Sequence, residues 1–292
     1  MCFCGSPARD AAVMLRLPAR LSGQRQRAVR DGLSVAGVAY AAFFVAAELT
    51  RGANPPGLDA RAYWAVGDGA PYAASLAVGQ PGAFLYAPPM ALAFAPASLL
   101  PWPVFLSLWF ALLLGALVWM ARGWSLAILA FIPVLFELYY GNVNLLIAAA
   151  IVLGFRYPGA WAFVLFTKVT PGVGLLWFVF RREWRQLAGV AAVTFAVGVV
   201  SFVLAPGLWS QWAESLRRDL VSPASPGIAV PLWARTAVSV VVVWFGARTD
   251  RPWTVPVAAM LALPVLWVAG FSVAVGAVPL LRHTATSPEP QG

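Results

Sequence analysis

A short polar stretch between long apolar runs holds the residues best suited to chemistry. Residues 58–64 read LDARAYW and place one carboxylate, Asp59, beside Arg61 and the aromatic side chains of Tyr63 and Trp64. A carboxylate can accept the proton of an attacking hydroxyl group, and a guanidinium group suits a phosphate. Asp59 is therefore either a catalytic base at a membrane surface or an ordinary loop carboxylate, and the local pattern leaves both interpretations open.

The scarcity of histidine and cysteine limits the kinds of active site that this chain can form. His283 is the single histidine and lies near the C-terminus, and Cys2 and Cys4 are the only cysteines. The sequence therefore offers no disulfide framework and no spacing typical of metal ligands. We expect carboxylate chemistry without a metal or another cofactor. The other carboxylates expected on the same face as Asp59 are Asp68, Glu214 and Asp219.

The only lysine of the chain lies inside an apolar stretch. Lys168 is part of WAFVLFTKVTPGVGLLWF. A charged side chain at bilayer depth costs at least about 2.5 kcal/mol on insertion scales, so it usually faces a partner or a cavity. Three interpretations remain: an ion pair with Glu137, extension of the side chain towards a membrane interface, or contact with an anionic lipid head group.

Two further polar stretches interrupt the apolar runs. Asn142 and Asn144 lie in YYGNVNLL, where capping of a helix start explains one of the two but not both. Tyr86 lies in LYAPPM, directly before prolines that suit the first turn of a helix. Tyr86 is thus placed either as a helix-flanking residue or as part of the lining of a site.

The composition decides what surrounds these residues. Hydrophobic residues make up 61% of the chain and charged residues 11%, with a mean hydropathy of +0.78. A soluble domain carries about 25% charged residues, so this chain predicts an all-α polytopic membrane protein with about ten transmembrane helices. The alternating polarity of a membrane barrel strand is absent. The helices are expected near 33–49, 87–101, 103–121, 124–140, 143–155, 159–180, 187–205, 231–246 and 253–281, the last divided into two.

The charge distribution predicts the orientation. Six of the arginines precede the first apolar run, and the net charge is +9. We interpret residues 1–32 as a basic cytoplasmic tail under the positive-inside rule, with membrane lipids and not nucleic acid as the partner. Residues 33–282 then form one transmembrane domain, and 283–292 a disordered tail. Both termini are expected in the cytoplasm of a multi-pass cell-membrane protein. Two extracytoplasmic loops, about 50–85 and 206–230, would form a site at the outer membrane face.

The motifs taken in order resemble a known family. They are Asp59 with Tyr63 and Trp64, then Tyr86-Ala-Pro-Pro, Gly141-Asn-Val-Asn, Lys168-Val-Thr-Pro and Arg181-Arg-Glu-Trp-Arg. Across residues 33–281 this order resembles the polyprenyl-phosphate-dependent glycosyltransferases of the C superfamily. The specific likeness is to glycosyltransferase family 87, which includes actinobacterial α-1,2-mannosyltransferases of the cell envelope.

The resemblance implies a reaction. It is the transfer of a sugar, usually mannose, from a polyprenyl-phosphate donor to a lipid or glycan acceptor outside the membrane. Asp59 matches the catalytic first-loop aspartate of the family and is our general base. The expected substrate-binding residues are Arg61, Tyr63, Trp64, Tyr86, Asn142, Asn144 and Lys168. Among these, Arg61 and Lys168 are the candidate phosphate contacts, and Tyr63 and Trp64 are candidates for stacking on the sugar.

The chain also departs from the family pattern. Members are generally longer, and many carry a Ser-Pro-x-x-Trp-x-His motif in a late helix. In this chain Leu263 replaces the serine and Ala269 replaces the histidine. Two alternatives to an enzyme therefore remain, a non-catalytic subunit and a transporter of lipid-linked sugars in the same pathway.

Overall fold

The fold is built from helices. A computed structural model describes residues 23–52, 54–68, 71–72, 83–221, 227 and 230–286, and every regular element among them is helical. The predicted all-α class is thus confirmed. The α-helices are α1 Gly23–Arg51, α2 Leu58–Trp64, α3 Pro88–Phe94, α4 Trp102–Ala121, α5 Ser125–Ile128, α6 Ile132–Tyr140, α7 Asn144–Gly154, α8 Trp161–Thr167, α9 Leu176–Phe180, α10 Trp184–Leu204, α11 Pro206–Val221, α12 Leu232–Arg248, α13 Thr254–Leu261 and α14 Ala277–Thr286. The 3₁₀ helices are η1 Ala65–Asp68, η2 Ala95–Leu99, η3 Arg122–Trp124, η4 Pro158–Ala160, η5 Thr170–Leu175 and η6 Val268–Gly276.

Few of these helices can cross a bilayer alone. Among the described residues, Gly23–Arg51, Trp102–Ile128 and Trp184–Leu204 are long and apolar enough, and α6 with α7 adds a fourth if this pair, bent by 109°, is one span. The expected ten spans are not confirmed. The reason is visible in the predicted helix 159–180, where the chain leaves helical geometry at Lys168, between α8 and η5. An apolar run need not be one continuous helix.

Several boundaries differ from the predicted ones. The first helix begins at Gly23 rather than near residue 33, because arginine and glutamine are good helix formers and extend it into the basic stretch. Most of the expected loop 206–230 is the helix α11, and the expected loop 50–85 contains α2. The last helix, α14, runs to Thr286, beyond the predicted end of the domain. The rest of both predicted tails lies outside the described residues.

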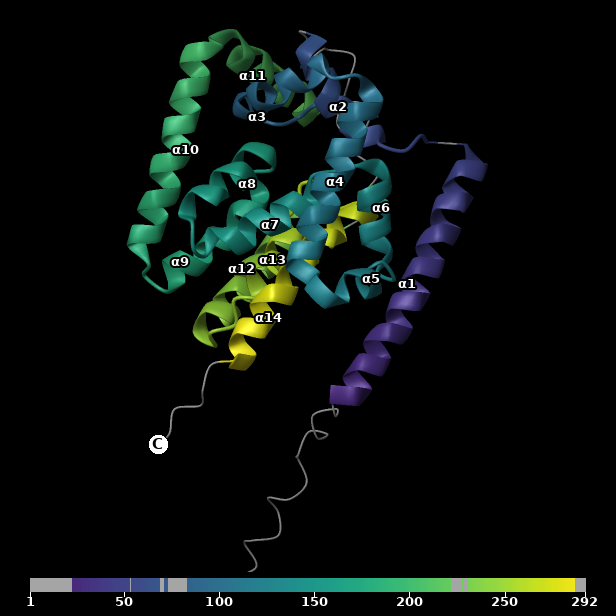
Figure 1. The fold of residues 1–292 in the computed structure, drawn as a ribbon. Helices are drawn as coiled ribbons and strands as arrows, with labels where there is room; N and C mark the ends of the chain where they lie inside the picture. The colour runs from purple at the N-terminus through teal and green to yellow at the C-terminus, as the bar shows by residue number, and fades with distance from the viewer. Residues whose placement is uncertain are drawn as a thin grey trace, which may run out of the picture.

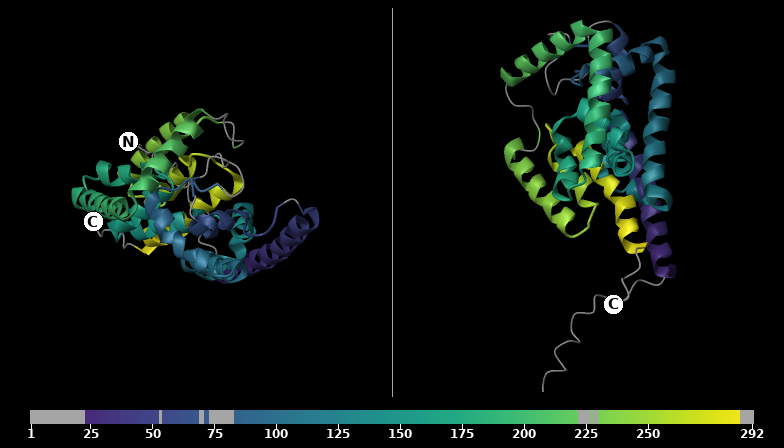
Figure 2. Two further views of the ribbon diagram at one scale, coloured as in Figure 1. Left: turned by 90° about the horizontal axis from the view of Figure 1, so that it is seen from above. Right: turned by 90° about the vertical axis from the view of Figure 1, so that its left-hand side faces the viewer.

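The helices divide the molecule into two ends. Figure 1 shows α2, α3 and α11 together at one end, while the start of α1 and the end of α14 lie at the other. The side view in Figure 2 shows the long helices running between these ends. Helix α1 packs along α5 at the side of the bundle, and a Cβ atom at Gly37 would collide with the carbonyl oxygen of Leu126. Most of the interior is apolar, with Trp161 and Phe178 almost fully buried.

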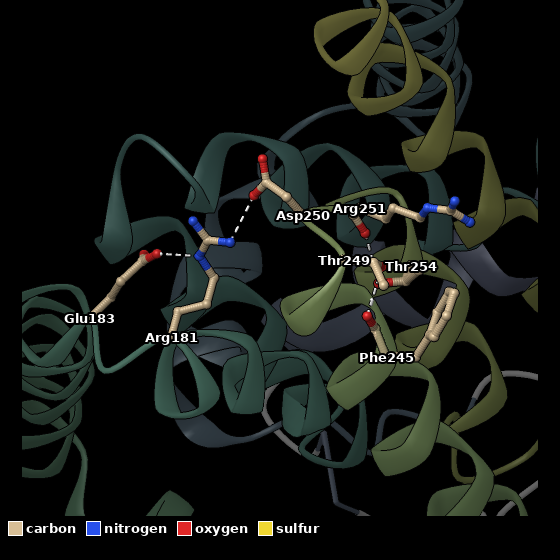
Figure 3. A network of polar contacts seen from close by, with 7 residues as sticks. All are labelled: Arg181, Glu183, Phe245, Thr249, Asp250, Arg251 and Thr254. Carbon is tan, nitrogen blue, oxygen red and sulfur yellow. Dashed lines mark hydrogen bonds and ion pairs between the residues drawn. The ribbon is translucent and has the colours of Figure 1, made fainter. Parts of the chain in front are cut away.

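A polar network joins two turns at the end opposite α2, α3 and α11. Arg181, after α9, places its Nε 2.8 Å from Glu183 Oε1 and its Nη1 2.7 Å from Asp250 Oδ1 (Figure 3). The second turn is closed by the Thr254 hydroxyl, which donates to the carbonyl of Arg251 at 2.9 Å. The turn between α9 and α10 is thereby fixed to the turn between α12 and α13.

Candidate active site

The sequence LDARAYW forms the short helix α2, which presents two faces. Gly57 precedes it at a φ of 75°, a conformation that favours glycine, and donates its N–H to the carbonyl of Tyr139 at 2.7 Å. Residues four apart lie on the same side of a helix, whereas residues two apart do not. Asp59 and Tyr63 therefore share one face of α2, and Arg61 and Trp64 share another.

Asp59 meets the turn between α6 and α7. Gly141, at a φ of 72°, ends α6, and its carbonyl accepts a 2.7 Å hydrogen bond from Trp109 Nε1. This turn directs Asn142 towards α2, and Asn142 Nδ2 donates to Asp59 Oδ2 at 2.7 Å. Asn142 Oδ1 accepts the N–H of Val143 at 2.8 Å, which fixes the orientation of the amide. Among the described residues, Asp59 Oδ1 has no hydrogen-bond partner.

Lys168 reaches the same turn from the non-helical segment between α8 and η5. Its Nζ donates to Asn144 Oδ1 at 2.7 Å and lies 3.4 Å from Asn142 Oδ1. The two asparagines that the sequence singled out thus both face the only lysine. Within the described part of the chain Lys168 makes no ion pair. The direct pair with Glu137, one of the three interpretations of this lysine, is therefore absent, and Asn144 lies between the two charges.

Glu137 caps the start of α7. Its Oε2 accepts from Asn144 Nδ2 at 2.8 Å, and its Oε1 accepts from the backbone N–H of Leu145 at 3.0 Å. Helix α7 begins at Asn144 and has no side-chain cap from the preceding residue Val143. The expectation that an asparagine caps this helix is therefore wrong, because the carboxylate of Glu137 performs that role.

Tyr63 and Tyr86 form a buried pair behind Asp59. Their hydroxyl oxygens lie 3.0 Å apart and their ring centroids 5.7 Å apart. Phe94 stacks on Tyr63 as well, at 5.1 Å. Protein side chains therefore occupy the ring faces of Tyr63 that the sugar-stacking hypothesis requires. The backbone N–H of Ala87 donates to the carbonyl of Phe166 at 2.9 Å, which joins the Tyr86 segment to the segment that carries Lys168.

Arg61 and Trp64 lie apart from this group. The Arg61 guanidinium is centred 5.4 Å from the ring centroid of Trp102, and Trp64 Nε1 donates to the carbonyl of Leu100 at 2.8 Å. Arg61 is exposed. The structure thus brings Asp59, Asn142, Asn144, Lys168, Tyr63 and Tyr86 together and leaves these two aside, because the α2 helix turns them away from Asp59.

The environment of Asp59 makes it a stronger base than an exposed carboxylate. Its side chain is partly buried, and burial raises its pKa above the ordinary value. The hydrogen bond from Asn142 and the positive charge of Lys168 oppose that rise. A carboxylate with a raised pKa and one oxygen that accepts no hydrogen bond from the described residues is suited to accept a proton from a hydroxyl group. The described residues contain no cluster of His, Cys, Asp or Glu able to hold a metal ion.

Helix α11 contributes residues that the sequence reasoning missed. Trp212 Nε1 donates to the carbonyl of Leu85 at 3.2 Å, and Arg218 Nη2 donates to the carbonyl of Tyr72 at 2.9 Å. The Tyr72 hydroxyl in turn donates to the carbonyl of Tyr86 at 2.7 Å. Helix α11 therefore fixes the backbone at Tyr72 and Leu85, next to Tyr86. The tryptophans of the expected loop, spaced three apart at 209 and 212, were the signal for this helix.

An apolar groove lies beside α3, the helix that follows Tyr86. It has a volume of about 400 Å³ and lies between α3 and α10, lined by three residues of the former and five of the latter. Ser201 is the one polar residue among the described residues that line it. The groove is therefore suited to a hydrocarbon chain.

Comparison with known families identifies the class. The model of glycosyltransferase family 87 matches residues 84–287, more than half of the chain. The chain belongs to glycosyltransferase family 87. The family match contains Tyr86, Asn142, Asn144 and Lys168, whereas Asp59 precedes it. Neither curated proteins nor solved structures give a match. Membership of family 87 makes this protein a membrane glycosyltransferase with a sugar donor and an acceptor as substrates.

Proposed function

We propose that this family 87 member transfers mannose from a polyprenyl-phosphate donor to a lipid or glycan acceptor on the extracytoplasmic side of the membrane. The observation that carries the proposal is the link between a carboxylate and an ammonium group through one amide. Asn142 donates to Asp59 and its oxygen faces Lys168. A proton acceptor and a cation for a phosphate thus belong to one site.

The proposed reaction is an inverting displacement. The acceptor hydroxyl oxygen attacks the anomeric carbon of the sugar while the bond from that carbon to the phosphate oxygen breaks. The electron pair leaves with the phosphate, and the hydroxyl proton goes to Asp59, which acts as general base. Lys168 stabilises the charge that develops on the phosphate. The phosphate leaves as a stabilised anion, so the step does not require a separate acid.

The apolar groove supports a lipid-linked donor. A polyprenyl phosphate combines an anionic head with a hydrocarbon tail. The protein offers one feature that suits each part. The cation of Lys168 suits the head, and the groove between α3 and α10 suits the first part of the tail. Asn142, Asn144 and Tyr86 remain candidates for contacts with the sugar or phosphate. Arg61 and Trp64, on the other face of α2, are weaker candidates.

A direct transfer assay tests the proposal. The full-length protein in proteoliposomes is given radiolabelled polyprenyl-phosphate mannose together with membrane lipids from the cell of origin. We expect labelled mannose to appear in a product that is resistant to mild acid, unlike the sugar phosphate of the donor. The glucose-linked donor is the matched comparison for the sugar. Intact donor with no labelled product would favour a non-catalytic subunit, and label moving across the bilayer without transfer would favour a transporter.

A further inference from the structure

A buried carboxylate stands behind the proposed phosphate contact. Glu137 is fully buried, and both of its carboxylate oxygens accept hydrogen bonds, from Asn144 Nδ2 and from the N–H of Leu145. It does not reach Lys168 or Asp59, so it has no direct part in the proposed reaction. We infer that Glu137 is a positioning residue that aligns Lys168 for the donor phosphate through the amide of Asn144. This inference rests on the proposed function.

The hydrogen bonds of Glu137 are consistent with a carboxylate whose charge is already stabilised. Both of its partners are N–H donors, and one of them belongs to the first turn of α7. The N-terminus of a helix favours a negative charge because its N–H groups have no partner within the helix. Helix α7 and Asn144 therefore stabilise the Glu137 carboxylate, and the charge of Lys168 is not consumed by a contact ion pair.

The amide of Asn144 transmits this arrangement. A side-chain amide has a donor end and an acceptor end. Because Glu137 accepts from Nδ2, Oδ1 must point the other way, where Lys168 donates to it at 2.7 Å. Without the carboxylate, the amide can rotate and present its NH₂ group to the lysine, which removes the contact. Glu137 thus determines which end of Asn144 the lysine meets.

One N–H group of Lys168 has no partner among the described residues. Its ammonium group has three N–H donors, and the oxygens of Asn142 and Asn144 lie in reach of two of them, at 3.4 and 2.7 Å. Within the described residues no other acceptor is bonded to Nζ. The third N–H is available to a phosphate oxygen. The two asparagines therefore act as supports for the ammonium group, and the donor phosphate completes its set of hydrogen bonds.

Two variants distinguish a role of Glu137 in positioning Lys168 from a role in the stability of the fold. Glu137→Gln keeps the size of the side chain but has one oxygen for two donors, so one bond to Asn144 or Leu145 is lost. The double variant Glu137→Gln with Asn144→Asp reverses the polarity of the link. In it the glutamine oxygen accepts from Leu145, the glutamine NH₂ donates to the new carboxylate, and that carboxylate accepts from Lys168. Every hydrogen bond of the original network is restored with the same total charge, but Lys168 now forms a contact ion pair with the new carboxylate instead of meeting a neutral amide.

The measurement is the affinity of the full-length protein for radiolabelled polyprenyl-phosphate mannose, with kinetics of transfer and thermal midpoints alongside. For Glu137→Gln we expect the donor affinity to fall roughly tenfold to a hundredfold, the range of one hydrogen bond to a charged group. The double variant should recover the thermal midpoint but not the donor affinity, because the new carboxylate forms an ion pair with Lys168, and the acceptor KM should stay unchanged. In a Lys168→Met background, Glu137→Gln should have no further effect, because coupled residues are not additive. Glu183→Gln, at the opposite end of the bundle, is the matched control and should bind donor as the wild type does.

Several results would overturn the inference. One is an unchanged donor affinity in Glu137→Gln with only a lower thermal midpoint. Another is a folded double variant that binds donor as tightly as the wild type, and this result decides the matter even if Glu137→Gln fails to fold. A third is an effect of Glu137→Gln that adds fully to that of Lys168→Met. A wild-type protein that binds no donor would instead contradict the proposed function.

Discussion

The amide of Asn142 donates to the carboxylate of Asp59 across 83 residues of sequence, at 2.7 Å. Asp59 precedes the region that matches family 87, whereas Asn142 lies within it. This hydrogen bond therefore ties α2 to the matched part of the chain. It also places the carboxylate one amide away from Lys168, whose Nζ is 3.4 Å from the oxygen of the same asparagine.

The first prediction concerns Asp59 as the base. Asp59→Asn keeps an oxygen that can accept from Asn142, but an amide cannot take a proton from the acceptor. We expect transfer to fall roughly 10²–10⁴-fold, the usual contribution of a general base, with donor affinity near that of the wild type. Steady-state transfer and donor binding are measured in parallel. Retention of more than about a tenth of the wild-type rate would be too small a loss for this role.

The second prediction follows from the pKa of Asp59. Burial raises this pKa above the unfolded value, so the folded state favours the protonated carboxyl group. The associated stability is present at low pH and is lost as pH rises through the folded pKa. Asp59→Asn should therefore raise the thermal midpoint at neutral pH, and the gain should shrink towards pH 4. In the wild type, transfer should fall as pH drops through the same raised pKa. A midpoint for Asp59→Asn below that of the wild type at neutral pH would contradict this.

Much of the site could be predicted from residue types, because few polar residues exist in an apolar chain. Lys168, Asn142 and Asn144 stood out for that reason, and the structure brings all three together. The hydrogen bonds from Lys168 to the two asparagines could not be predicted from the sequence. The sequence allowed a direct ion pair between Glu137 and Lys168. The distance between these two side chains is set by the end of α8 and by the turn at Gly141. Both features depend on packing among helices that are distant in sequence.

The fold was predictable in class but not in detail. Composition indicates helices, since long apolar runs in a membrane must satisfy their own backbone groups. It does not reveal where a run breaks. The run around Lys168 contains a lysine and a proline that end helical geometry, whereas α11 was hidden because its polar face resembles a loop. Hydropathy thus marks apolar segments, and tertiary packing decides how many helices each contains.

The third prediction concerns Lys168. Lys168→Met keeps a long unbranched side chain, one atom shorter, and removes the charge, so the donor phosphate loses its cation. We expect the donor KM to rise roughly tenfold to a hundredfold, as for the loss of a hydrogen bond to a charged group, while the protein still inserts in membranes. Lys168→Arg is the control that keeps the charge in a different geometry, and it should retain more donor affinity. Equal donor affinity in all three proteins would remove Lys168 from the site.

The fourth prediction separates the two faces of α2. Arg61 lies against Trp102 and not beside Asp59, so Arg61→Ala should change transfer by less than about threefold, as is usual for surface positions. An exposed cation–π contact contributes about 0.5–1 kcal/mol, so a small loss of stability is expected. Donor KM and thermal midpoint are the measurements. A tenfold weaker donor affinity would return Arg61 to the phosphate site that the sequence suggested.

The fifth prediction concerns the side of the membrane on which the site lies. Helices α2, α3 and α11 lie at one end of the molecule, and the start of α1 and the end of α14 lie at the other (Figure 1). The arginine-rich turn after α9 belongs to that second end, which the positive-inside rule assigns to the cytoplasm. After Cys2 and Cys4 are replaced by serine, we introduce Glu214→Cys on α11 and, separately, Arg185→Cys on α10, both at exposed positions. In intact cells, a membrane-impermeant maleimide should label the Glu214 variant directly and the Arg185 variant only after lysis. The reverse pattern would place the proposed site in the cytoplasm, where the donor would have to present its sugar from the other leaflet.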